Sequence, residues 1–531
     1  MRKYVRFLFG LNGYLRDRVT PEEALAAART ALRERVGQRA ESLLKLLDRG
    51  VYQHPRSPYL PLLESRRIRL DDVRRRLDND GVEATLQWLR SEGVYYTVDE
   101  FKGKAEVMRN GLRFRLQERA FDNPFLSGAY EVSTGGSRSA GTRIRIDFDY
   151  LRQRSLYDAF ILDLHGALTS PIANWFPVFP NAPGINSSLR FARIGNPPRK
   201  WFSQVGNRTR VSWERRLGLR YILSMSRLCG VPLARPEYVS LNDAYAVARW
   251  AAGVLEESPA CVVYTFASSA VRVCMAAQEN DLSLRGARFL VTGEPLTVQK
   301  RREIESTGAT AVPIYGISEA GVIAAGCTHH YAEADHCHVL KDSVAIISHR
   351  VQAPLTGMAV DAFLFCTLMR ESPKLLLNVG VGDFGALTTG PCDCHFGELG
   401  FDTHMACIRS YEKLTGEGVT FVDTDLVDIL ENALPARFGG QSTDFQLLEE
   451  EDQRGLTRLK LLVSPRLGQV DESEVASTFV ELLKAGREAR ESWADSGSQM
   501  WSQARTIRVQ RDFPVPTRSG KILPFDVARK A

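Results

Sequence analysis

The sequence predicts an α/β protein in which a large N-terminal domain with helix-covered sheets precedes a small α+β domain. Strand-like and helix-like segments alternate between residues 238 and 311, which is typical of a parallel sheet covered by helices. Apolar residues recur at helical spacing through residues 1–105, and a shorter mixture of helices and strands follows residue 411. We therefore expect a helical N-terminal region of the large domain at 1–105, its core at 106–410 and a C-terminal domain at 411–531.

The N-terminal region is expected to be mostly helical. Thr20, followed by Pro21 and two glutamates, is typical of a helix N-terminus, because its hydroxyl can accept a hydrogen bond from a backbone amide of the first turn. Residues 70–77 and 84–89 repeat the helical spacing. The basic run at 74–76 is expected on a solvated helix face.

The later segments are assigned from their periodicity. We expect strands at 142–149, 261–266 and 287–292, with helices at 155–166 and 271–278. Residues 170–203, rich in Pro, Asn, Gly and aromatic side chains, predict a long irregular loop that could line a pocket or lie pinned on the surface. In the C-terminal domain, helices are expected at 424–431 and 475–489 and strands at 445–448 and 456–463.

Composition restricts the class of protein. A chain of 531 residues can form two or more domains with substantial cores. Its formal net charge of +6 favours weak attraction to anions such as nucleotides, but not a dedicated nucleic-acid surface. No apolar run approaches the length of a membrane span, and no secretory signal is visible, so we expect a cytoplasmic protein without a membrane partner. Nine scattered cysteines also fit a reducing compartment.

Residues 311–321 (AVPIYGISEAG) are the first candidate site. An apolar, strand-like run ends at Gly316 and is followed by a hydroxyl and a carboxylate. Polar groups at the carboxyl end of a buried strand are where α/β proteins collect ligands. Glu319 could hold a divalent metal and Ser318 could donate a hydrogen bond to a phosphate. A plain strand-to-loop corner would give the same pattern.

Two further stretches carry phosphate-binding chemistry. Residues 132–143 combine glycines, hydroxyls and arginines, which predicts a cradle for an anion, although the G-K-[ST] ending of a Walker loop is missing. Its candidate residues are Ser133, Thr134, Gly135, Gly136, Ser137 and Arg138. Near the C-terminus, residues 516–522 (PTRSGKI) place Lys521 after a glycine. Taken alone, residues 132–143 would more often be a surface loop, and Lys521 would more often be a solvated charge.

In this order and at this spacing, the three stretches resemble the signature of the adenylate-forming superfamily, which includes acyl-CoA synthetases, adenylation domains and luciferase. Residues 293–297 (GEPLT) and 315–319 (YGISE) are most similar to the phenylacetate–CoA ligase branch. The resemblance covers roughly residues 90–531. It implies that the core is an adenylation domain and that the C-terminal domain is a mobile lid with a hinge at Tyr411 or Glu412.

The resemblance also implies an AMP-forming ligase that activates a carboxylic acid with MgATP and transfers the acyl group to a thiol, with coenzyme A as the expected acceptor. Trp175, Phe179, Tyr264 and Phe266 would allow an aromatic acid, although a fatty chain would suit the same apolar walls. Lys521 would bind the carboxylate and the α-phosphate, Glu319 would hold Mg²⁺, and Ser318 and residues 133–138 would bind phosphates. The implied adenine and ribose contacts are Gly293, Glu294, Pro295, Tyr315, Gly316, Asp383 and Arg409.

A Cys/His-rich segment at 327–395 predicts a structural zinc site. Thiolate and imidazole ligands at paired spacing are what Zn²⁺ needs, and four of them close its tetrahedron. By position, the resemblance assigns Cys327, His338, Cys392 and Cys394, with Cys337 and His336 as substitutes. Free buried cysteines and surface histidines are the alternative.

The chain departs from the family pattern in three places. Arginines stand in the phosphate loop where a G-K-P ending is usual, Pro313 replaces a common Asp or Asn, and Asn378 replaces an arginine. These departures leave open a carrier protein, an amine or another nucleophile as acceptor, and nitrite activation for diazotisation. A non-catalytic nucleotide-binding homologue and a zinc-stapled nucleic-acid binder are the alternatives from other classes. The sequence also leaves open whether the chain forms a homodimer.

Overall fold

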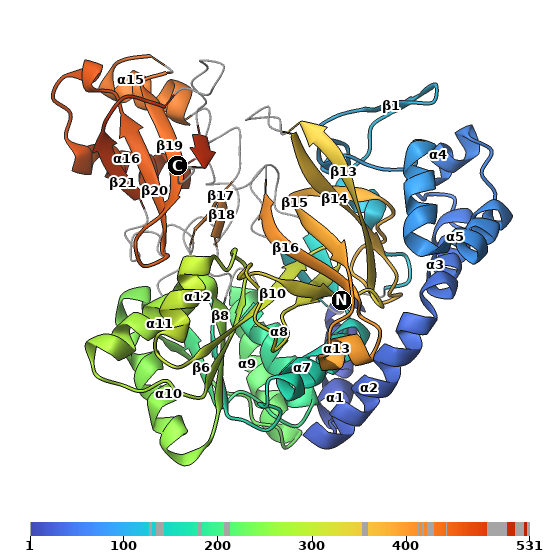
Figure 1. Ribbon diagram of the computed structural model, residues 1–531, viewed down its shortest axis with the longest axis horizontal. Helices are drawn as coiled ribbons and strands as arrows, with labels where there is room; N and C mark the ends of the chain where they lie inside the picture. The colour runs from blue at the N-terminus through green and yellow to red at the C-terminus, as the bar shows by residue number, and fades with distance from the viewer. Residues whose placement is uncertain are drawn as a thin grey trace.

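A twelve-stranded mixed sheet runs through the large N-terminal part of the described chain (Figure 1). One half of this sheet is parallel, in the order β10-β9-β8-β5-β6-β7. Its strands are β5 (Ile172–Trp175), β6 (Lys200–Ser203), β7 (Pro236–Tyr238), β8 (Cys261–Phe266), β9 (Ala287–Thr292) and β10 (Thr310–Ile317). The computed structural model describes residues 2–126, 130–133, 143–178, 183–205, 213–352, 359–410, 414–416, 419–421, 429–441, 443–485, 507–515 and 525–527.

The other half of the sheet is antiparallel, in the order β13-β14-β15-β16-β12-β11. Its strands are β11 (Gly321–Ala325), β12 (Cys337–Val339), β13 (Val344–Gln352), β14 (Ala359–Thr367), β15 (Val379–Thr389) and β16 (Thr403–Ser410). β10 joins the halves, because it pairs parallel with β9 and antiparallel with β11. Its register with β11 shifts between Tyr315 and Gly316, which is a β-bulge.

Helices cover both faces of the parallel half, as the alternation of strands and helices predicts. Cys261 and Val263 of β8 belong to the core that also contains α10 (Tyr245–Glu257) and α11 (Ala267–Glu279). Val262, which points to the opposite face, packs with α7 (Phe148–Leu164). α12 (Val298–Glu305) packs beside α11 on the first face, whereas α8 (Pro183–Arg193) packs beside α7 on the second and α9 (Trp213–Leu228) contacts α1 (Arg2–Arg16) (Figure 1).

The N-terminal region is helical, as predicted, and packs mainly on the antiparallel half of the sheet. Thr20 and Glu23 form a capping box at the start of α2. The basic run on α5 is exposed, and its arginines pair with nearby aspartates, which confirms a solvated face. The elements are α1 (Arg2–Arg16), α2 (Pro21–Gly37), α3 (Arg39–Leu47), α4 (Leu60–Ser65), α5 (Leu70–Ser91) and α6 (Val98–Phe101), followed by β1 (Val107–Arg109), β2 (Leu112–Phe114), β3 (Tyr130–Ser133) and β4 (Arg143–Ile146).

The prediction of an irregular loop at residues 170–203 is wrong. This segment contributes β5, α8 and β6, and two of these elements are strands of the large sheet. All residues of β5 are buried, so the strand shows no polar–apolar alternation, and its flanking Pro and Asn residues resemble a loop. Trp175 is therefore fully buried in the sheet and donates a hydrogen bond to the Val239 carbonyl (3.2 Å). Phe179 lies outside the described residues.

The helix expected at 155–166 begins earlier than predicted. α7 starts at Phe148, because the Asp147 side chain accepts a hydrogen bond from the Asp149 amide (3.0 Å) and caps the helix. The strand predicted before it is present as the shorter β4.

The C-terminal part is a separate small α+β unit (Figure 1). Its four-stranded sheet has the order β21-β20-β19-β22. Both predicted strands are present and α16 confirms the later helix, whereas residues 424–428 of the earlier one lie outside the described chain and 429–433 form a π-helical turn. The elements are β17 (Leu414–Gly416), β18 (Val419–Phe421), α15 (Leu434–Phe438), β19 (Phe445–Glu451), β20 (Thr457–Val463), α16 (Glu472–Ala485), β21 (Ile507–Arg511) and β22 (Phe525–Val527).

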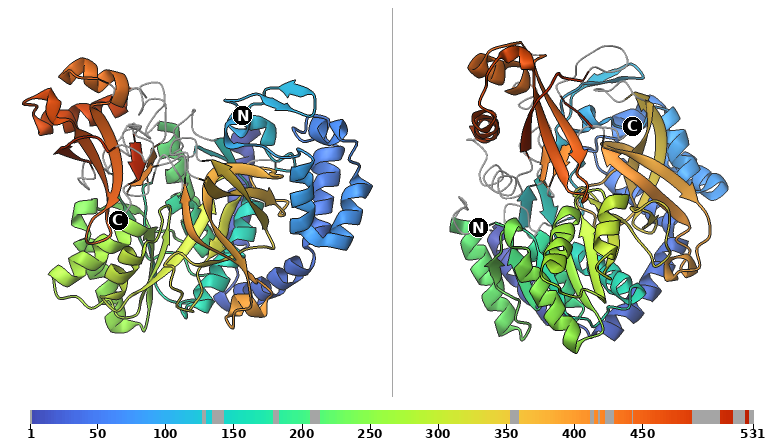
Figure 2. Two further views of the ribbon diagram at one scale, coloured as in Figure 1. Left: turned by 45° about the horizontal axis from the view of Figure 1, so that its top comes forward. Right: turned by 60° about the vertical axis from the view of Figure 1, so that its left-hand side comes forward.

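The turn between β19 and β20 contacts the start of α12 in the large part (Figure 2). Thr297 donates a hydrogen bond to Glu451 (2.7 Å), and Lys300 donates one to the Thr457 hydroxyl (3.1 Å). A side chain at Gly455 would place its Cβ 2.8 Å from the backbone nitrogen of Lys300, so this close approach of the two chain segments requires glycine. The C-terminal unit therefore contacts the large N-terminal part through polar side chains, in addition to its covalent connection along the chain.

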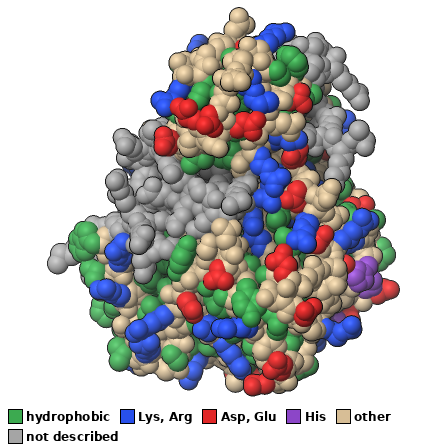
Figure 3. Space-filling view, turned by 90° about the vertical axis from the view of Figure 1, so that its left-hand side faces the viewer, with side chains coloured by type: hydrophobic (Ala, Val, Ile, Leu, Met, Phe, Trp, Pro, Cys, Tyr) green, Lys and Arg blue, Asp and Glu red, His purple; other side chains and the backbone are tan. Residues whose placement is uncertain are grey.

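The surface in Figure 3 mixes both signs of charge. Lys and Arg side chains occur together with Asp and Glu over the C-terminal part and over the helices beneath it. Among the described residues, no helix combines the length and the apolar character needed to cross a membrane.

Asn378→Ala is expected to destabilise the fold. Asn378 is fully buried at φ +53°, and its amide donates hydrogen bonds to the carbonyls of Leu86 (2.8 Å) and Val94 (3.2 Å), which tie the N-terminal helices to the sheet. The variant should lose about 2 kcal/mol in free energy of unfolding, measured by denaturant titration, because two buried carbonyls lose their donor. Asn110→Ala is the matched control.

Asn110 has the same φ of +53°, but it is exposed and its amide donates to a single carbonyl, that of Glu92 (2.9 Å). Its loss should stay below about 1 kcal/mol. Equal losses of unfolding free energy in the two variants would show that the positive φ shared by both residues, and not the buried amide of Asn378, causes the destabilisation.

Candidate functional site

The bulge in β10 places the first candidate residues. Tyr315 lies at the bulge, and Ser318 and Glu319 occupy the turn into β11. Ser318 is exposed, whereas Glu319 is only 7% exposed. The Glu319 carboxylate accepts a hydrogen bond from the Lys102 ammonium (3.2 Å), which follows α6. Glu319 is thus a nearly buried carboxylate whose charge is paired with an ammonium group.

The residues predicted to bind ribose lie on adjacent strands. Asp383 of β15 is the register partner of Ser410 on β16, and Arg409, the preceding residue of β16, is the register partner of Phe384. The Tyr315 hydroxyl donates a hydrogen bond to Asp383 (2.7 Å) and links this pair to β10. Burial and the Asp383 carboxylate raise the pKa of Tyr315 well above its usual range, with a smaller contribution from Glu319, so the phenol keeps its proton. The structure thus brings Tyr315, Glu319 and Asp383 together, while the Arg409 guanidinium pairs with Asp335 (2.9 Å).

The loop after β9 holds the predicted adenine contacts in a fixed shape. The Glu294 side chain is fully buried, accepts a hydrogen bond from Ser268 and pairs with the Lys300 ammonium (3.2 Å). This leaves the backbone of the loop, rather than the Glu294 carboxylate, facing outward. Gly293 has φ +77°, and a Cβ there would lie 2.8 Å from the Phe266 ring, so the turn requires glycine.

Several predicted residues cannot be compared with the structure. Lys521, the hinge residues Tyr411 and Glu412, and the phosphate-loop residues 134–138 lie outside the described chain. The backbone of Ser133 ends β3, and its side chain is likewise not described. The predicted phosphate loop therefore connects β3 to β4.

Two residues of the site were missed by sequence reasoning. Lys102 lies 217 residues before its partner Glu319, and Asp335, which pairs with Arg409 (2.9 Å), lies 74 residues before it. Lys102 ends residues 95–102, a stretch that resembles a segment of the phenylacetate–CoA ligase branch but for which the resemblance implies only a scaffolding role, and Asp335 stands in no local pattern that separates it from a solvated charge. The strand order that brings them to the site is visible only in the fold.

The predicted zinc ligands come together in space. The donor atoms of Cys327, His338, Cys392 and Cys394 all lie within 4.8 Å of one another. His338 Nδ1 lies 2.7 Å from the Phe401 carbonyl, which can only accept, so Nε2 is left facing Cys394 Sγ at 3.3 Å. Three sulfurs and one imidazole nitrogen fit a tetrahedral Zn²⁺.

The two substitute ligands point elsewhere. The buried Cys337 thiol lies 3.6 Å from the Pro313 carbonyl, and His336 stacks on the Tyr331 ring at 3.4 Å. Within the four-residue cluster, a hydrogen bond from Cys327 lowers the pKa of Cys394 well below its usual range, and a hydrogen bond from His338 makes a smaller contribution in the same direction. A thiolate in the cluster is the form that binds a metal.

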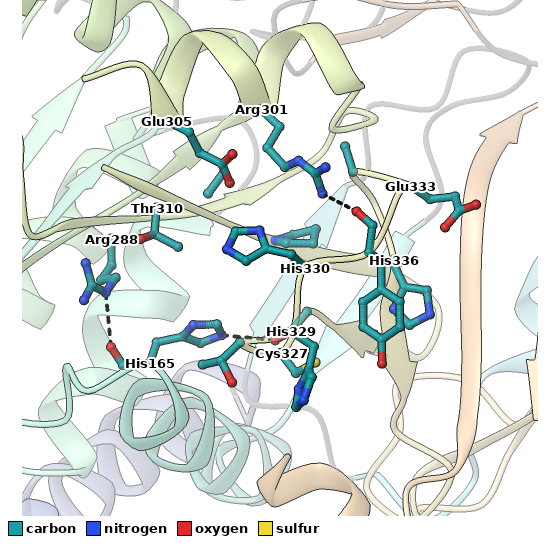
Figure 4. A pocket seen from close by; sticks show the side chains of 16 residues that line it. His165, Arg288, Arg301, Glu305, Thr310, Cys327, His329, His330, Glu333 and His336 are labelled. Atoms are coloured by element: carbon teal, nitrogen blue, oxygen red, sulfur yellow. Dashed lines mark hydrogen bonds between the residues drawn. The ribbon is translucent and has the colours of Figure 1, made fainter. Parts of the chain in front are cut away.

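A cavity of about 210 Å³ lies beside this cluster and not at the residues predicted to bind a nucleotide (Figure 4). Cys327, His165 and Arg288 line it, together with Arg301, which donates a hydrogen bond to the Tyr331 carbonyl (2.9 Å). Since Glu319, Asp383 and Arg409 are not among its lining residues, this cavity is not the candidate nucleotide site.

Comparisons with known proteins give structural likeness only. No family model matches the chain, and no curated protein matches it. A 2-hydroxyisobutyryl-CoA ligase in complex with 2-HIB-AMP and CoA is similar, with 14% identity, a TM-score of 0.47 and coverage of 96% of this chain and 91% of that one. The amide bond synthetase McbA from Marinactinospora thermotolerans has 12% identity, a TM-score of 0.41 and coverage of 79% and 72%.

An acyl-CoA synthetase from Brucella canis has 15% identity, a TM-score of 0.31 and coverage of 74% of this chain and 62% of that one. The similar solved structures named here are thus acyl-CoA ligases or synthetases and an amide bond synthetase.

Cys394→Ser is expected to abolish stoichiometric zinc binding. The purified wild-type protein should contain about one equivalent of Zn²⁺ by elemental analysis, because the four donors fit one tetrahedral ion. The variant should lose this metal, and its melting temperature should fall. A chelator should lower the melting temperature of the wild type in the same direction.

Cys366→Ser is the matched control, because Cys366 is also a buried cysteine but lies in the core of the antiparallel half. It should keep its zinc even if its stability falls. Wild-type protein that contains no zinc and does not respond to added Zn²⁺ would contradict the site.

Proposed function

We propose that this protein is an AMP-forming ligase that activates a carboxylic acid with MgATP as an acyl-adenylate. The observation that carries the proposal is the placement of Tyr315, Glu319 and Asp383 around the end of β10. These residues come from segments far apart in the sequence. The same residues carry the motifs that resemble the adenylate-forming superfamily.

Their chemistry suits adenylation. A carboxylate oxygen of the acid attacks the α-phosphorus of ATP, and the bond to the leaving pyrophosphate breaks. Both reactants are anions, so positioning and charge neutralisation carry the step. Glu319 would hold Mg²⁺, which supplies charge neutralisation when bound, and Ser318 and residues 133–138 would bind phosphate oxygens. Lys102, which pairs with Glu319, places a further cation at the same position.

The nucleoside would be held by β15, β16 and the loop after β9. A carboxylate has several acceptor positions, so Asp383 can accept a hydrogen bond from a ribose hydroxyl while it also accepts the one from the Tyr315 hydroxyl. The Arg409 guanidinium would donate a second contact. The Gly293–Pro295 backbone would line the adenine, since the Glu294 carboxylate is engaged with Lys300.

The C-terminal part would act as the lid that delivers Lys521 to the acid and the α-phosphate. Its β19–β20 turn rests on α12, directly after the adenine loop. A lid that rotates would then open the site to the acceptor nucleophile. We propose a thiol, with coenzyme A as the first candidate, as that nucleophile.

An aromatic acid is the proposed substrate. The Phe176 ring meets the rings of Tyr264 and Phe266 edge to face, at 4.9 and 5.0 Å between centroids. Phe266 also packs against Gly293, so this aromatic group adjoins the proposed adenine loop. Phe176 is fully buried and Phe266 is only 9% exposed, so the partly buried Tyr264 and the edge of Phe266 would provide the apolar wall for another aromatic ring.

Lys521→Ala is expected to abolish adenylation while leaving ATP binding largely intact. Wild type should exchange labelled pyrophosphate into ATP with one class in a panel of aromatic, short-chain and long-chain acids and nitrite. The variant should lose at least about 100-fold in exchange rate, because it removes a charge aimed at the reacting centre. Thiol, carrier-protein and amine acceptors are then tested with the acid that supports exchange.

Lys460→Ala is the control for the lysine, since Lys460 lies in the same C-terminal sheet and pairs with Glu450 (2.6 Å). It should exchange at the wild-type rate. An unchanged exchange rate in Lys521→Ala would show that Lys521 does not take part in adenylation. ATP binding without exchange for any acid would favour the non-catalytic homologue.

Glu319→Gln is expected to weaken the binding of the Mg²⁺ that supports exchange. Loss of the carboxylate should lower the exchange rate by about 100-fold and raise the Mg²⁺ concentration needed for half-maximal rate. Glu64→Gln, at an exposed glutamate on α4, should leave both quantities unchanged. A Mg²⁺ titration that is identical in wild type and Glu319→Gln would rule out Glu319 as the metal-holding group.

A further inference from the structure

β16 carries a strained bulge directly before Arg409. On β15, Phe384 and Ala386 are two residues apart, but their partners on β16, Arg409 and Ala406, are three apart. β16 therefore holds one extra residue, and Cys407 within it has φ +53°, a conformation that costs a non-glycine residue free energy. Gly385 lies opposite, where a Cβ would be 2.6 Å from the Ala406 carbonyl oxygen.

A single carboxylate holds this bulge in place. Asp335 accepts hydrogen bonds from the backbone amides of Cys407 and Ile408, each at 2.9 Å. The same carboxylate pairs with Arg409 Nη1, also at 2.9 Å. Asp335 is only 6% exposed, so these charge-assisted contacts lie in a poorly solvated place where they are strong.

The segment that carries Asp335 is itself anchored. It connects β11 to β12, and Cys327 at its start belongs to the Cys/His cluster. The Tyr331 carbonyl in its middle accepts a hydrogen bond from Arg301 of α12 (Figure 4). The Arg409 guanidinium is thus paired with a carboxylate on an anchored segment, while its side chain stays 41% exposed.

We propose that Asp335 is a positioning residue for the nucleotide: it fixes the bulge of β16 and thereby aims Arg409 at the ribose. This inference rests on the proposed function, in which Arg409 contacts the ribose. Without Asp335, Arg409 would have to be ordered at the moment of binding, which costs side-chain entropy. Asp335 touches neither ATP nor the acid, so its effect should appear in ATP affinity and not in the rate of the chemical step.

The test is a double-mutant cycle on ATP affinity, measured directly by calorimetric titration and by the KM for ATP in exchange. Asp335→Asn should weaken ATP binding by roughly ten-fold or more, because an amide cannot accept both N–H groups or neutralise the arginine. The kcat of exchange should change little. In an Arg409→Gln background, the same substitution should have almost no further effect on ATP affinity.

Such non-additive losses of ATP affinity would indicate that Asp335 acts through Arg409. General structural damage would instead lower ATP affinity by the same factor in both backgrounds. Asp402→Asn is the control, since Asp402 pairs with Lys341 (2.6 Å) near the same cluster and should leave ATP affinity unchanged. Unchanged affinity in Asp335→Asn, or losses that simply add, would overturn the inference. Wild type that fails to bind ATP would overturn the proposed function as well.

A second variant covers the case in which Asp335→Asn does not fold. Glycine adopts φ +53° without strain, so Cys407→Gly should preserve the bulge when the carboxylate is lost. Asp335→Asn is then measured in the Cys407→Gly background, with the melting temperature as the check on folding. Loss of ATP affinity against this reference tests the Asp335–Arg409 pair alone.

Discussion

The site depends on the double pairing of β10. This strand is parallel to β9 on one edge and antiparallel to β11 on the other, so the two halves of the large sheet meet along it. The bulge at Tyr315 and Gly316 turns the chain where the antiparallel half begins. That turn buries Glu319 beside Lys102 and brings the Tyr315 hydroxyl to Asp383 on a strand that β10 does not pair with. A different register of β10 would separate these groups.

Features with a local chemical or periodic signature could be predicted from the sequence. The amphipathic helices of the N-terminal region, β8 and β9 carry their spacing in consecutive residues, and the structure contains them. The cluster of Cys327, His338, Cys392 and Cys394 could also be predicted, because cysteine and histidine are rare and their clustering is visible. The α/β class follows from the same alternation of elements.

What could not be predicted depends on contacts between distant residues. β5 is buried on both faces, so nothing in its own sequence separates it from a loop. Asp335 and Lys102 become part of the site only because the strand order brings them to Arg409 and Glu319. Glu294 was expected at the adenine, but its side chain is engaged by Lys300, which sequence spacing does not reveal. The positions of Lys521 and residues 134–138 remain predictions from the sequence.

Gly321 shows that a motif can combine two unrelated demands. It closes the stretch that contains Ser318 and Glu319, has φ +96°, and a Cβ there would lie 2.3 Å from the Tyr150 hydroxyl. Any side chain at this position would collide with α7, so natural selection must retain glycine whether or not the protein binds a nucleotide. Invariance at Gly321 among relatives would therefore report packing against Tyr150, whereas invariance at Glu319 would report chemistry. A count of conserved positions would not separate the two.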